Sequence, residues 1–303
     1  MNNNNNTDVD ILARLDAMIV QESTIHCNNY FKKSPPSSSI VDGGDILNES
    51  SRKAMVIWIT QVQQTLKLNS ETVAIAMSFF DRYLSSGRGN SQAVLHNKGQ
   101  FQLAAITCFY TATKIYEPVV LGLDMLTQIC RDTYTKEDII AMERDILSAL
   151  QWKVAVHTSM EFIRTLLELV GELAAHTHVV DSLLLSCQKH MNHVITQLSL
   201  STCKPSIVGI SCLASVLTES KLLSVTQKQI IWGTLSRKVP FNLMPTQVIA
   251  AHQQCLSSKG TSLSSSKTVS SVETSPCKTM SSVTSTYKSS ISPVCVSKMA
   301  RQA

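Results

Sequence analysis

The stretch Phe101–Lys114, FQLAAITCFYTATK, decides the fold. From Phe101 to Thr113 it carries no charge, and its apolar or small side chains surround a helix on all sides instead of forming one stripe. Such a helix must be buried all round, and small residues such as Ala104 and Ala112 let neighbouring helices approach closely. The run is too short and too polar to span a membrane. We therefore predict the central helix of a helical bundle, ending at Lys114.

Segments with helical periodicity and short connections lie on both sides of this run. The helices expected around it cover residues 51–66, 70–84, 123–130 and 135–150. The last begins with Thr135-Lys-Glu-Asp138, which resembles a capping box with aspartate in place of glutamate. No segment shows convincing strand alternation, so we predict an all-α first block that covers residues 46–153.

A second helical series follows and covers residues 154–256. It begins with the capping box Thr158-Ser-Met-Glu161, continues over residues 179–200, and contains the uncharged run PSIVGISCLASVL at 205–217. Each block thus has a wholly buried helix in third place. We interpret this as an internal structural duplication and predict two five-helix repeats.

The two ends of the chain differ from these blocks. In residues 1–45 we expect a disordered asparagine run at 2–6, an amphipathic helix at 11–22 and a linker at Ser34–Ser39. Residues 257–303 are rich in Ser, Thr and Lys and have hardly any aromatic residues. They cannot bury enough apolar surface to offset their ordering entropy, so we expect a disordered tail.

Charge and cysteine content limit the possible partners. The tail accounts for the whole net charge of +5, so the body of the chain is neutral and gives little support for a nucleic-acid groove. The start of the chain has no basic and apolar leader, so the nine cysteines are expected to be reduced in cytoplasm or nucleus. No membrane segment is expected.

Several segments in a fixed order resemble the cyclin box over roughly residues 46–165. They are Arg52…Trp58, ETVAIAMSFFDRYLS (71–85), QLAAITCFYTATK (102–114), DTYTKEDIIAMERDIL (132–147) and LQW (150–152). KPSIV (204–208) is similar to the more variable second cyclin repeat. The resemblance implies a non-catalytic protein that needs no cofactor or metal. It would bind a cyclin-dependent kinase, activate it and control cell-cycle progression.

The resemblance also assigns a kinase-binding site. It implies that Lys114 and Glu143 reach backbone groups beside the mobile helix of the kinase, where charge-assisted hydrogen bonds are strong and directional. The apolar contacts around them would come from Ile115, Leu147, Trp152 and Val154. Without the resemblance, Lys114 could merely complement its helix C-terminus, Glu143 could lie on a solvated face, and Trp152 could pack between the repeats.

Two further sites follow from the same resemblance. Arg52 and Asp81 would form a buried ion pair that braces the first two helices of the repeat. A docking groove for substrate or inhibitor peptides would use the residues Arg52, Met55, Trp58, Gln61 and Gln102. Gln61 stands where the groove of many cyclins has an acid. Because an amide does not pair with arginine as a carboxylate does, binding of Arg-x-Leu peptides is in doubt.

Other patterns suggest different functions. Ser275-Pro and Ser292-Pro resemble sites of proline-directed phosphorylation, although Ser-Pro is frequent in any serine-rich tail. Cys187, His190 and His193 share a helix face and could bind zinc, but no fourth ligand is suggested, and a polar solvated face explains them better. A cyclin-like transcription factor or peptide-binding adaptor that activates no kinase is the main alternative.

Overall fold

A computed structural model of the chain describes residues 2–25, 27–32, 47–170, 177–221, 223–239, 251 and 253. All regular elements in these ranges are helices, which confirms the predicted all-α fold. No helix among them is long and apolar enough to cross a membrane. The tail from residue 257, with Ser275 and Ser292, and the linker at Ser34–Ser39 lie outside the described residues.

The first repeat contains the five predicted helices and one extra turn. Its elements are α2 (Glu49–Leu66), α3 (Glu71–Ser86), α4 (Ser91–Val94), α5 (Lys98–Tyr116), α6 (Leu123–Ile129) and α7 (Lys136–Ala149). Side chains cap three of these helices. Asn48 caps α2, Asn97 caps α5, and Thr135 forms with Asp138 the capping box predicted at the start of α7.

The second repeat has the same order of elements as far as it is described. Its elements are α8 (Ser159–Glu168), α9 (Thr177–Val194), α10 (Leu198–Ser201), α11 (Pro205–Glu219) and α12 (Val225–Lys238). The helix predicted at 179–200 is interrupted, because the chain turns at residues 195–197 before α10. A fifth helix would fall in residues 240–256, which lie almost entirely outside the described residues. The single turns α4 and α10 occupy equivalent places, directly before the central helix of each repeat.

The two central helices are buried as predicted. Every residue of α5 from Phe101 to Thr113 is buried, and α5 packs against both α3 and α7. In α11 the close approach occurs at Gly209. A β-carbon there would lie 2.8 Å from the Ser159 carbonyl oxygen of α8. Glycine therefore lets the backbones of α8 and α11 approach more closely than any other residue would allow.

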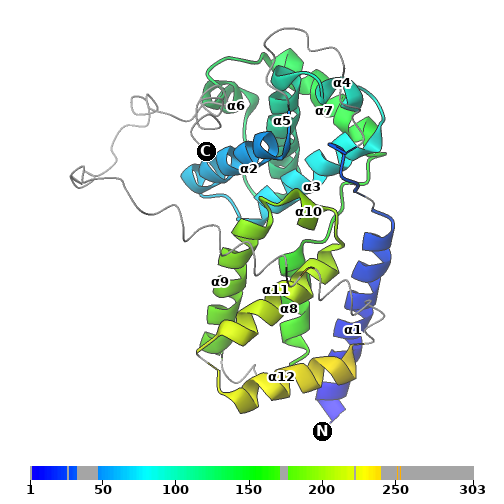
Figure 1. Cartoon of the computed structure of the whole chain (residues 1–303), viewed down its shortest axis with the longest axis vertical. Helices are drawn as coiled ribbons and strands as arrows, with labels where there is room; N and C mark the ends of the chain where they lie inside the picture. Colours follow the sequence, from blue (N-terminus) through cyan, green and yellow to red (C-terminus); the bar gives the residue numbers. More distant parts are fainter. Residues whose placement is uncertain are drawn as a thin grey trace, which may run out of the picture.

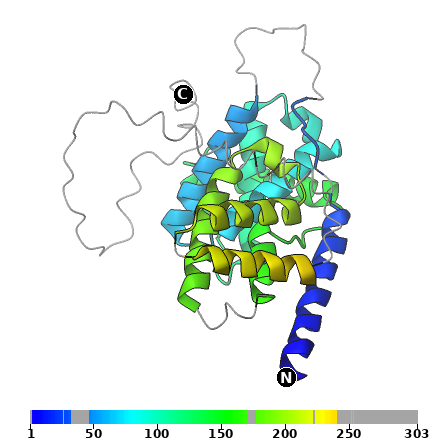
Figure 2. The same ribbon diagram turned by 60° about the horizontal axis from the view of Figure 1, so that its bottom comes forward.

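The N-terminal helix α1 (Asn2–Ser23) lies along the second repeat, beside α8 and the end of α12 (Figures 1 and 2). Ile11, Leu15 and Met18 bury its apolar face in the core of that repeat. Glu22 is buried and accepts hydrogen bonds from the Ser206 backbone N–H (3.0 Å) and hydroxyl (2.6 Å), which caps α11.

The expectation of a disordered asparagine run at residues 2–6 is wrong, since α1 begins at Asn2. Asparagine is a poor helix former, but a helix that tertiary packing has already nucleated extends at little cost. The run lies about one and a half to two and a half turns before Ile11, where that packing begins.

Candidate functional site

Lys114 and Glu143 lie together on adjacent helices. Lys114 is in the last turn of α5, and Glu143 is in the middle of α7. The Lys114 ammonium is 3.1 and 3.0 Å from the two carboxylate oxygens of Glu143. The hydroxyl of Thr111, one turn before Lys114, also donates to the Glu143 carboxylate (2.9 Å), and the ammonium lies 5.0 Å from the centroid of the Tyr110 ring. The pair therefore presents both charges at one place on the surface.

Geometry explains why these charges meet. From Phe101 to Thr113 α5 is uncharged and buried on all sides, so the next charged residue reaches solvent where the helix leaves the core, at Lys114. On α7 the buried side chains are those of Ile139, Met142, Ile146 and Ala149, which leaves Glu143 at the edge of the buried face. The lysine is exposed, whereas the glutamate is half-buried and held by Thr111. This is a surface pair with one well-positioned member.

Ile115 directly follows Lys114 on α5, and Leu147 lies one turn after Glu143 on α7. Ile115 is 45% exposed, Trp152 is 70% exposed, and Leu147 and Val154 are half-buried. Trp152 is thus not a core residue between the repeats, which was the competing interpretation of this tryptophan. All four predicted apolar contacts retain accessible surface.

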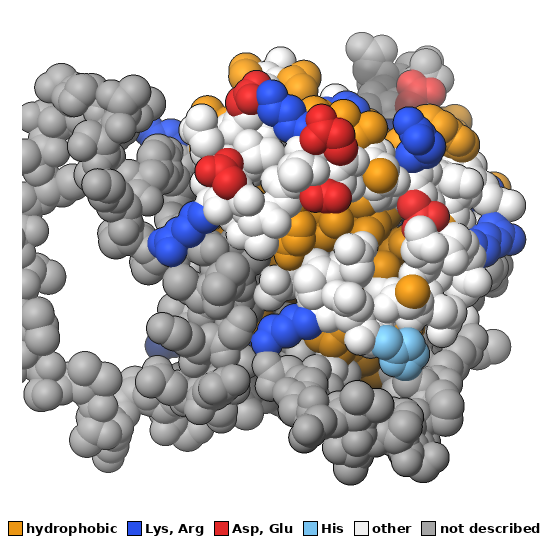
Figure 3. All heavy atoms as spheres, turned by 90° about the horizontal axis from the view of Figure 1, so that it is seen from above, with side chains coloured by type: hydrophobic (Ala, Val, Ile, Leu, Met, Phe, Trp, Pro, Cys, Tyr) orange, Lys and Arg blue, Asp and Glu red, His pale blue; other side chains and the backbone are white. Residues whose placement is uncertain are grey.

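Sequence reasoning missed other exposed apolar residues of this region. Val119 and Val120 follow α5 and are largely exposed. Ile140 is 42% exposed and stands one turn before Glu143 on the same face of α7. The helical spacing of Ile140, Glu143 and Leu147 could have revealed this residue. Seen from the end of the molecule formed by the first repeat, apolar side chains lie among charges of both signs, and no single sign dominates that face (Figure 3).

Arg52 and Asp81 form a bidentate ion pair between α2 and α3. The Arg52 Nε and Nη2 atoms are 2.8 and 2.7 Å from the two carboxylate oxygens of Asp81, and both side chains are buried. The Tyr30 hydroxyl also donates to Asp81 (2.9 Å). Burial alone would lower the pKa of Arg52, but the Asp81 carboxylate raises it above the ordinary value. The arginine therefore stays charged in the interior.

The reach of Arg52 into the second repeat was not predicted. Its Nη1 atom donates to the Ile195 carbonyl (2.8 Å), and its Nη2 atom donates to the Ser201 hydroxyl (2.7 Å). Both acceptors belong to the α9–α10 region. A single guanidinium therefore joins α2, α3 and the second repeat.

The residues expected to line a peptide groove are mostly internal. Arg52, Met55, Trp58 and Gln102 are buried in the first repeat, whereas Gln61 is exposed on α2. Beside Gln61 on the outer face of α2 stands Ile57, which is partly exposed. Of the residues expected to line the groove, only Gln61 offers open surface, together with its neighbour Ile57, and the groove stays a prediction.

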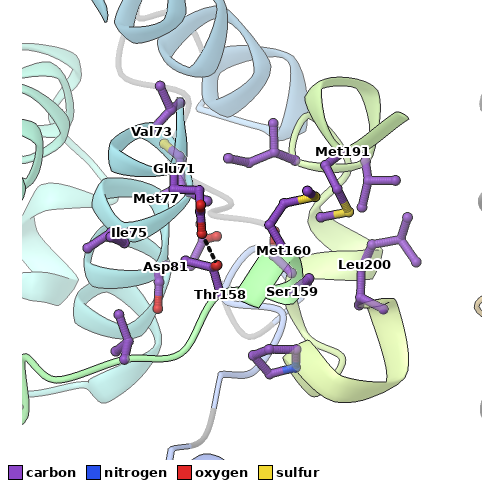
Figure 4. Close-up of a pocket in the computed structure, with 18 of the residues that line it drawn as sticks. Glu71, Val73, Ile75, Met77, Asp81, Thr158, Ser159, Met160, Met191 and Leu200 are labelled. Carbon is purple, nitrogen blue, oxygen red and sulfur yellow. Dashed lines mark hydrogen bonds between the residues drawn. The ribbon is translucent and has the colours of Figure 1, made fainter. Parts of the chain in front are cut away.

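A cavity of about 800 Å³ lies between the two repeats. Figure 4 shows α3 side chains on one side, including Met77, facing Met160 and Met191 of the second repeat. Glu71, at the start of α3, accepts a hydrogen bond from the Thr158 hydroxyl and forms an ion pair with Arg164 of α8. The predicted kinase-binding residues are not among those that line this cavity.

The alternative zinc site is not assembled. Cys187 and His190 are buried, whereas His193 is exposed. The expectation that all three side chains lie on one solvated face is therefore wrong. Within the described ranges no group of His, Cys, Asp and Glu is arranged to hold a metal ion. α9 turns its Cys187–His190 side toward the core of the second repeat.

Comparison with known proteins identifies this class of helical protein. Residues 20–155 match the protein family described as "Cyclin, N-terminal domain". This part, slightly under half of the chain, is a cyclin box of the cyclin family.

Among curated relatives, the putative cyclin-A3-1 of Arabidopsis thaliana is 32% identical over 44% of this chain and 36% of its own length. The G2/mitotic-specific cyclin-A of Hydra viridissima is 29% identical over 59% of this chain and 40% of its own. The matches thus span well under half the length of these relatives.

A solved structure shows a similar fold. The X-ray structure of a viral cyclin from herpesvirus saimiri matches 80% of this chain and 97% of its own with a TM-score of 0.58 and 16% identity. The match extends beyond the first repeat, which alone could not fill four fifths of the chain. The described helices of the second repeat therefore belong to a cyclin fold as well.

Proposed function

We propose that this protein is the activating, non-catalytic subunit of a cyclin-dependent protein kinase and that it controls cell-cycle progression. The observation that carries the proposal is the Lys114–Glu143 pair. The Lys114 ammonium lies 3.0 Å from the Glu143 carboxylate, and exposed apolar residues such as Ile115 and Ile140 are close to the pair along α5 and α7. The match of residues 20–155 to the cyclin N-terminal domain supports the same function.

The charges of the pair suit the backbone of a partner better than a side chain. Lys114 offers hydrogen-bond donors and Glu143 offers acceptors, so side by side they can bind a carbonyl and an N–H group of one segment. The surrounding Ile115, Leu147 and Trp152 would exclude water and strengthen these bonds. Binding would select the active position of the kinase helix from its ensemble, since only that position satisfies both charges.

The test is a double substitution, Lys114→Ala with Glu143→Ala. We expect kinase activation to be lost, because the donors and acceptors of the partner segment would be desolvated without partners. The thermal melt should change little, since a surface pair contributes about 0–1 kcal/mol. The kinase is first identified by affinity purification of the tagged chain from cycling cells, and phosphorylation of a Ser-Pro peptide is then measured with the purified proteins.

A matched control is available in the same repeat. Lys136 and Asp124 form another surface ion pair, between α7 and α6. The variant Lys136→Ala with Asp124→Ala removes the same two charges elsewhere and should activate the kinase like the unmodified chain. Full activation by the Lys114/Glu143 variant, or equal losses in both variants, would contradict the assigned interface.

The remaining functional assignments are also proposals. We place the complex in nucleus and cytoplasm, where the thiols of a chain with several buried cysteines stay reduced. A cyclin-fold adaptor that binds a peptide without activating a kinase is the second candidate, because Ile57 and Gln61 leave part of α2 accessible and uncharged. Binding of a partner without any gain in kinase activity would favour the adaptor.

A further inference from the structure

The linker between α7 and α8, residues 150–158, has an unusual backbone. Gln151 and Trp152 are consecutive non-glycine residues with positive φ, 55° and 58°. The Trp152 N–H donates to the Leu147 carbonyl (3.0 Å), which is the bond that closes a Schellman-type helix end, where glycine is the usual residue. Because L-residues rarely adopt this conformation, the surrounding structure must hold the linker in place.

Two side chains from other helices supply that hold. The Tyr116 hydroxyl, at the end of α5, donates to the Val154 carbonyl (2.8 Å) and accepts from the Val156 N–H (3.1 Å). Arg82 of α3 donates from Nη2 to the Lys153 carbonyl (2.7 Å) and is itself buried. Tyr116 and Arg82 thus fix three backbone groups within residues 153–156, two carbonyls and one N–H.

The chemistry of Tyr116 is specific to a phenol. A phenol can donate to one backbone group and accept from another at the same time, whereas a carboxylate could only accept. Burial raises the pKa of Tyr116, so the hydroxyl keeps its proton at neutral pH and remains a donor. This contact of Tyr116 was not predicted from the sequence.

Trp152, the residue that this arrangement presents, contributes little to the core. Its side chain is 70% exposed, and Ile115, directly before Tyr116 at the end of α5, is 45% exposed. An exposed tryptophan on a constrained backbone is favourable when a partner covers it. Because its backbone is already ordered, less conformational entropy is lost when the partner binds. Tryptophan is also enriched among residues that dominate binding energy.

We propose that Tyr116 and Arg82 are positioning residues that hold Trp152 as a preformed anchor for an apolar pocket of the kinase. The proposal rests on the proposed function, but it adds a mechanism that the Lys114–Glu143 pair does not supply. The anchor is set by the junction of the two repeats, so its position relative to that pair is fixed before the kinase binds.

The test is Tyr116→Phe, which removes one hydroxyl and keeps the ring. The matched control is Tyr134→Phe, because the Tyr134 hydroxyl also donates to a backbone carbonyl, that of Gly99, at a site away from the linker. We expect Tyr116→Phe to weaken kinase binding about tenfold, the effect of one to two net hydrogen bonds, whereas Tyr134→Phe should leave the affinity unchanged. Trp152→Ala should weaken binding at least as much as Tyr116→Phe.

A second measurement needs no kinase. In the full chain labelled with 5-fluorotryptophan, the ¹⁹F resonance of Trp152 is assigned with Trp152→Phe. We expect this resonance to shift and broaden in Tyr116→Phe but not in Tyr134→Phe. An unchanged resonance together with unchanged affinity would overturn the positioning role, and full binding by Trp152→Ala would overturn the anchor. If the unmodified chain binds no kinase, the proposed function fails along with the anchor, while the ¹⁹F spectra still decide whether Tyr116 holds the linker.

Discussion

Replacing Asp81 by alanine should destabilise the protein strongly, because the change leaves a buried arginine without its counter-charge. The carboxylate accepts three hydrogen bonds in the interior, two from Arg52 (2.8 and 2.7 Å) and one from the Tyr30 hydroxyl (2.9 Å). Without it, the buried guanidinium of Arg52 keeps only its bonds to the neutral acceptors Ile195 and Ser201. The loss is therefore dominated by an uncompensated charge.

The expected magnitude is about 3–5 kcal/mol of unfolding free energy, the range measured when one partner of a buried ion pair is removed. For a folded body of this size it corresponds to a fall in melting temperature of about 10 °C. The double variant Arg52→Leu with Asp81→Leu should lose less than Asp81→Ala alone, because no charge remains buried without a partner. The order of their unfolding free energies distinguishes the effect of the unpaired charge from the effect of lost packing.

The assay is urea denaturation monitored by circular dichroism. The unmodified chain and both variants are measured at the same ionic strength. A salt titration adds a further check, because a buried pair is screened much less than a surface pair. The reasoning is refuted if Asp81→Ala loses less than about 1 kcal/mol, or if the double variant is the less stable of the two.

Two further predictions concern packing and pH. Gly209→Ala should lower the unfolding free energy by about 1–3 kcal/mol, because its β-carbon would lie 2.8 Å from the Ser159 carbonyl oxygen. Gly233→Ala, with nothing within 4 Å of the added β-carbon, should raise it by up to about 1 kcal/mol. Equal melting temperatures of the two variants would contradict this. Burial raises the pKa of the Cys130 thiol from 9.0 to about 12, so the folded state holds this proton more tightly than the unfolded state. Stability should therefore fall as pH rises from about 9 to 12, by at most about 1.4 kcal/mol per pH unit from this group. Urea titrations of Cys130→Ala should show a correspondingly smaller fall.

The sequence was sufficient where one physical requirement dominates. An uncharged run with small residues on every face can only be a buried helix, and both α5 and α11 are buried as predicted. The meeting of Lys114 and Glu143 could be predicted only from the resemblance to cyclins, since periodicity alone does not tell which face of α7 adjoins α5. The single turns α4 and α10 were missed because four residues are too few to show a helical period.

Contacts between the repeats could not be predicted, because they depend on how two separately recognisable units pack. Nothing near Arg52 in the sequence indicates that it also binds the Ile195 carbonyl, far along the chain. The exposure of Trp152 is a similar case. A tryptophan in an apolar context is usually buried, but this one directly precedes a backbone segment that Tyr116 and Arg82 hold by hydrogen bonds.

These contacts have a common consequence for function. Arg52 ties α2 to the α9–α10 region, Glu71 ties α3 to Arg164 of α8, and Tyr116 ties α5 to the linker between the repeats. Each joins a helix of the first repeat to a segment beyond it, so the second repeat braces the surface that carries the Lys114–Glu143 pair. In the proposed kinase complex, a substitution at any of these ties should therefore weaken binding without contacting the kinase itself. The loss should be largest at Tyr116, the tie nearest to an exposed apolar side chain.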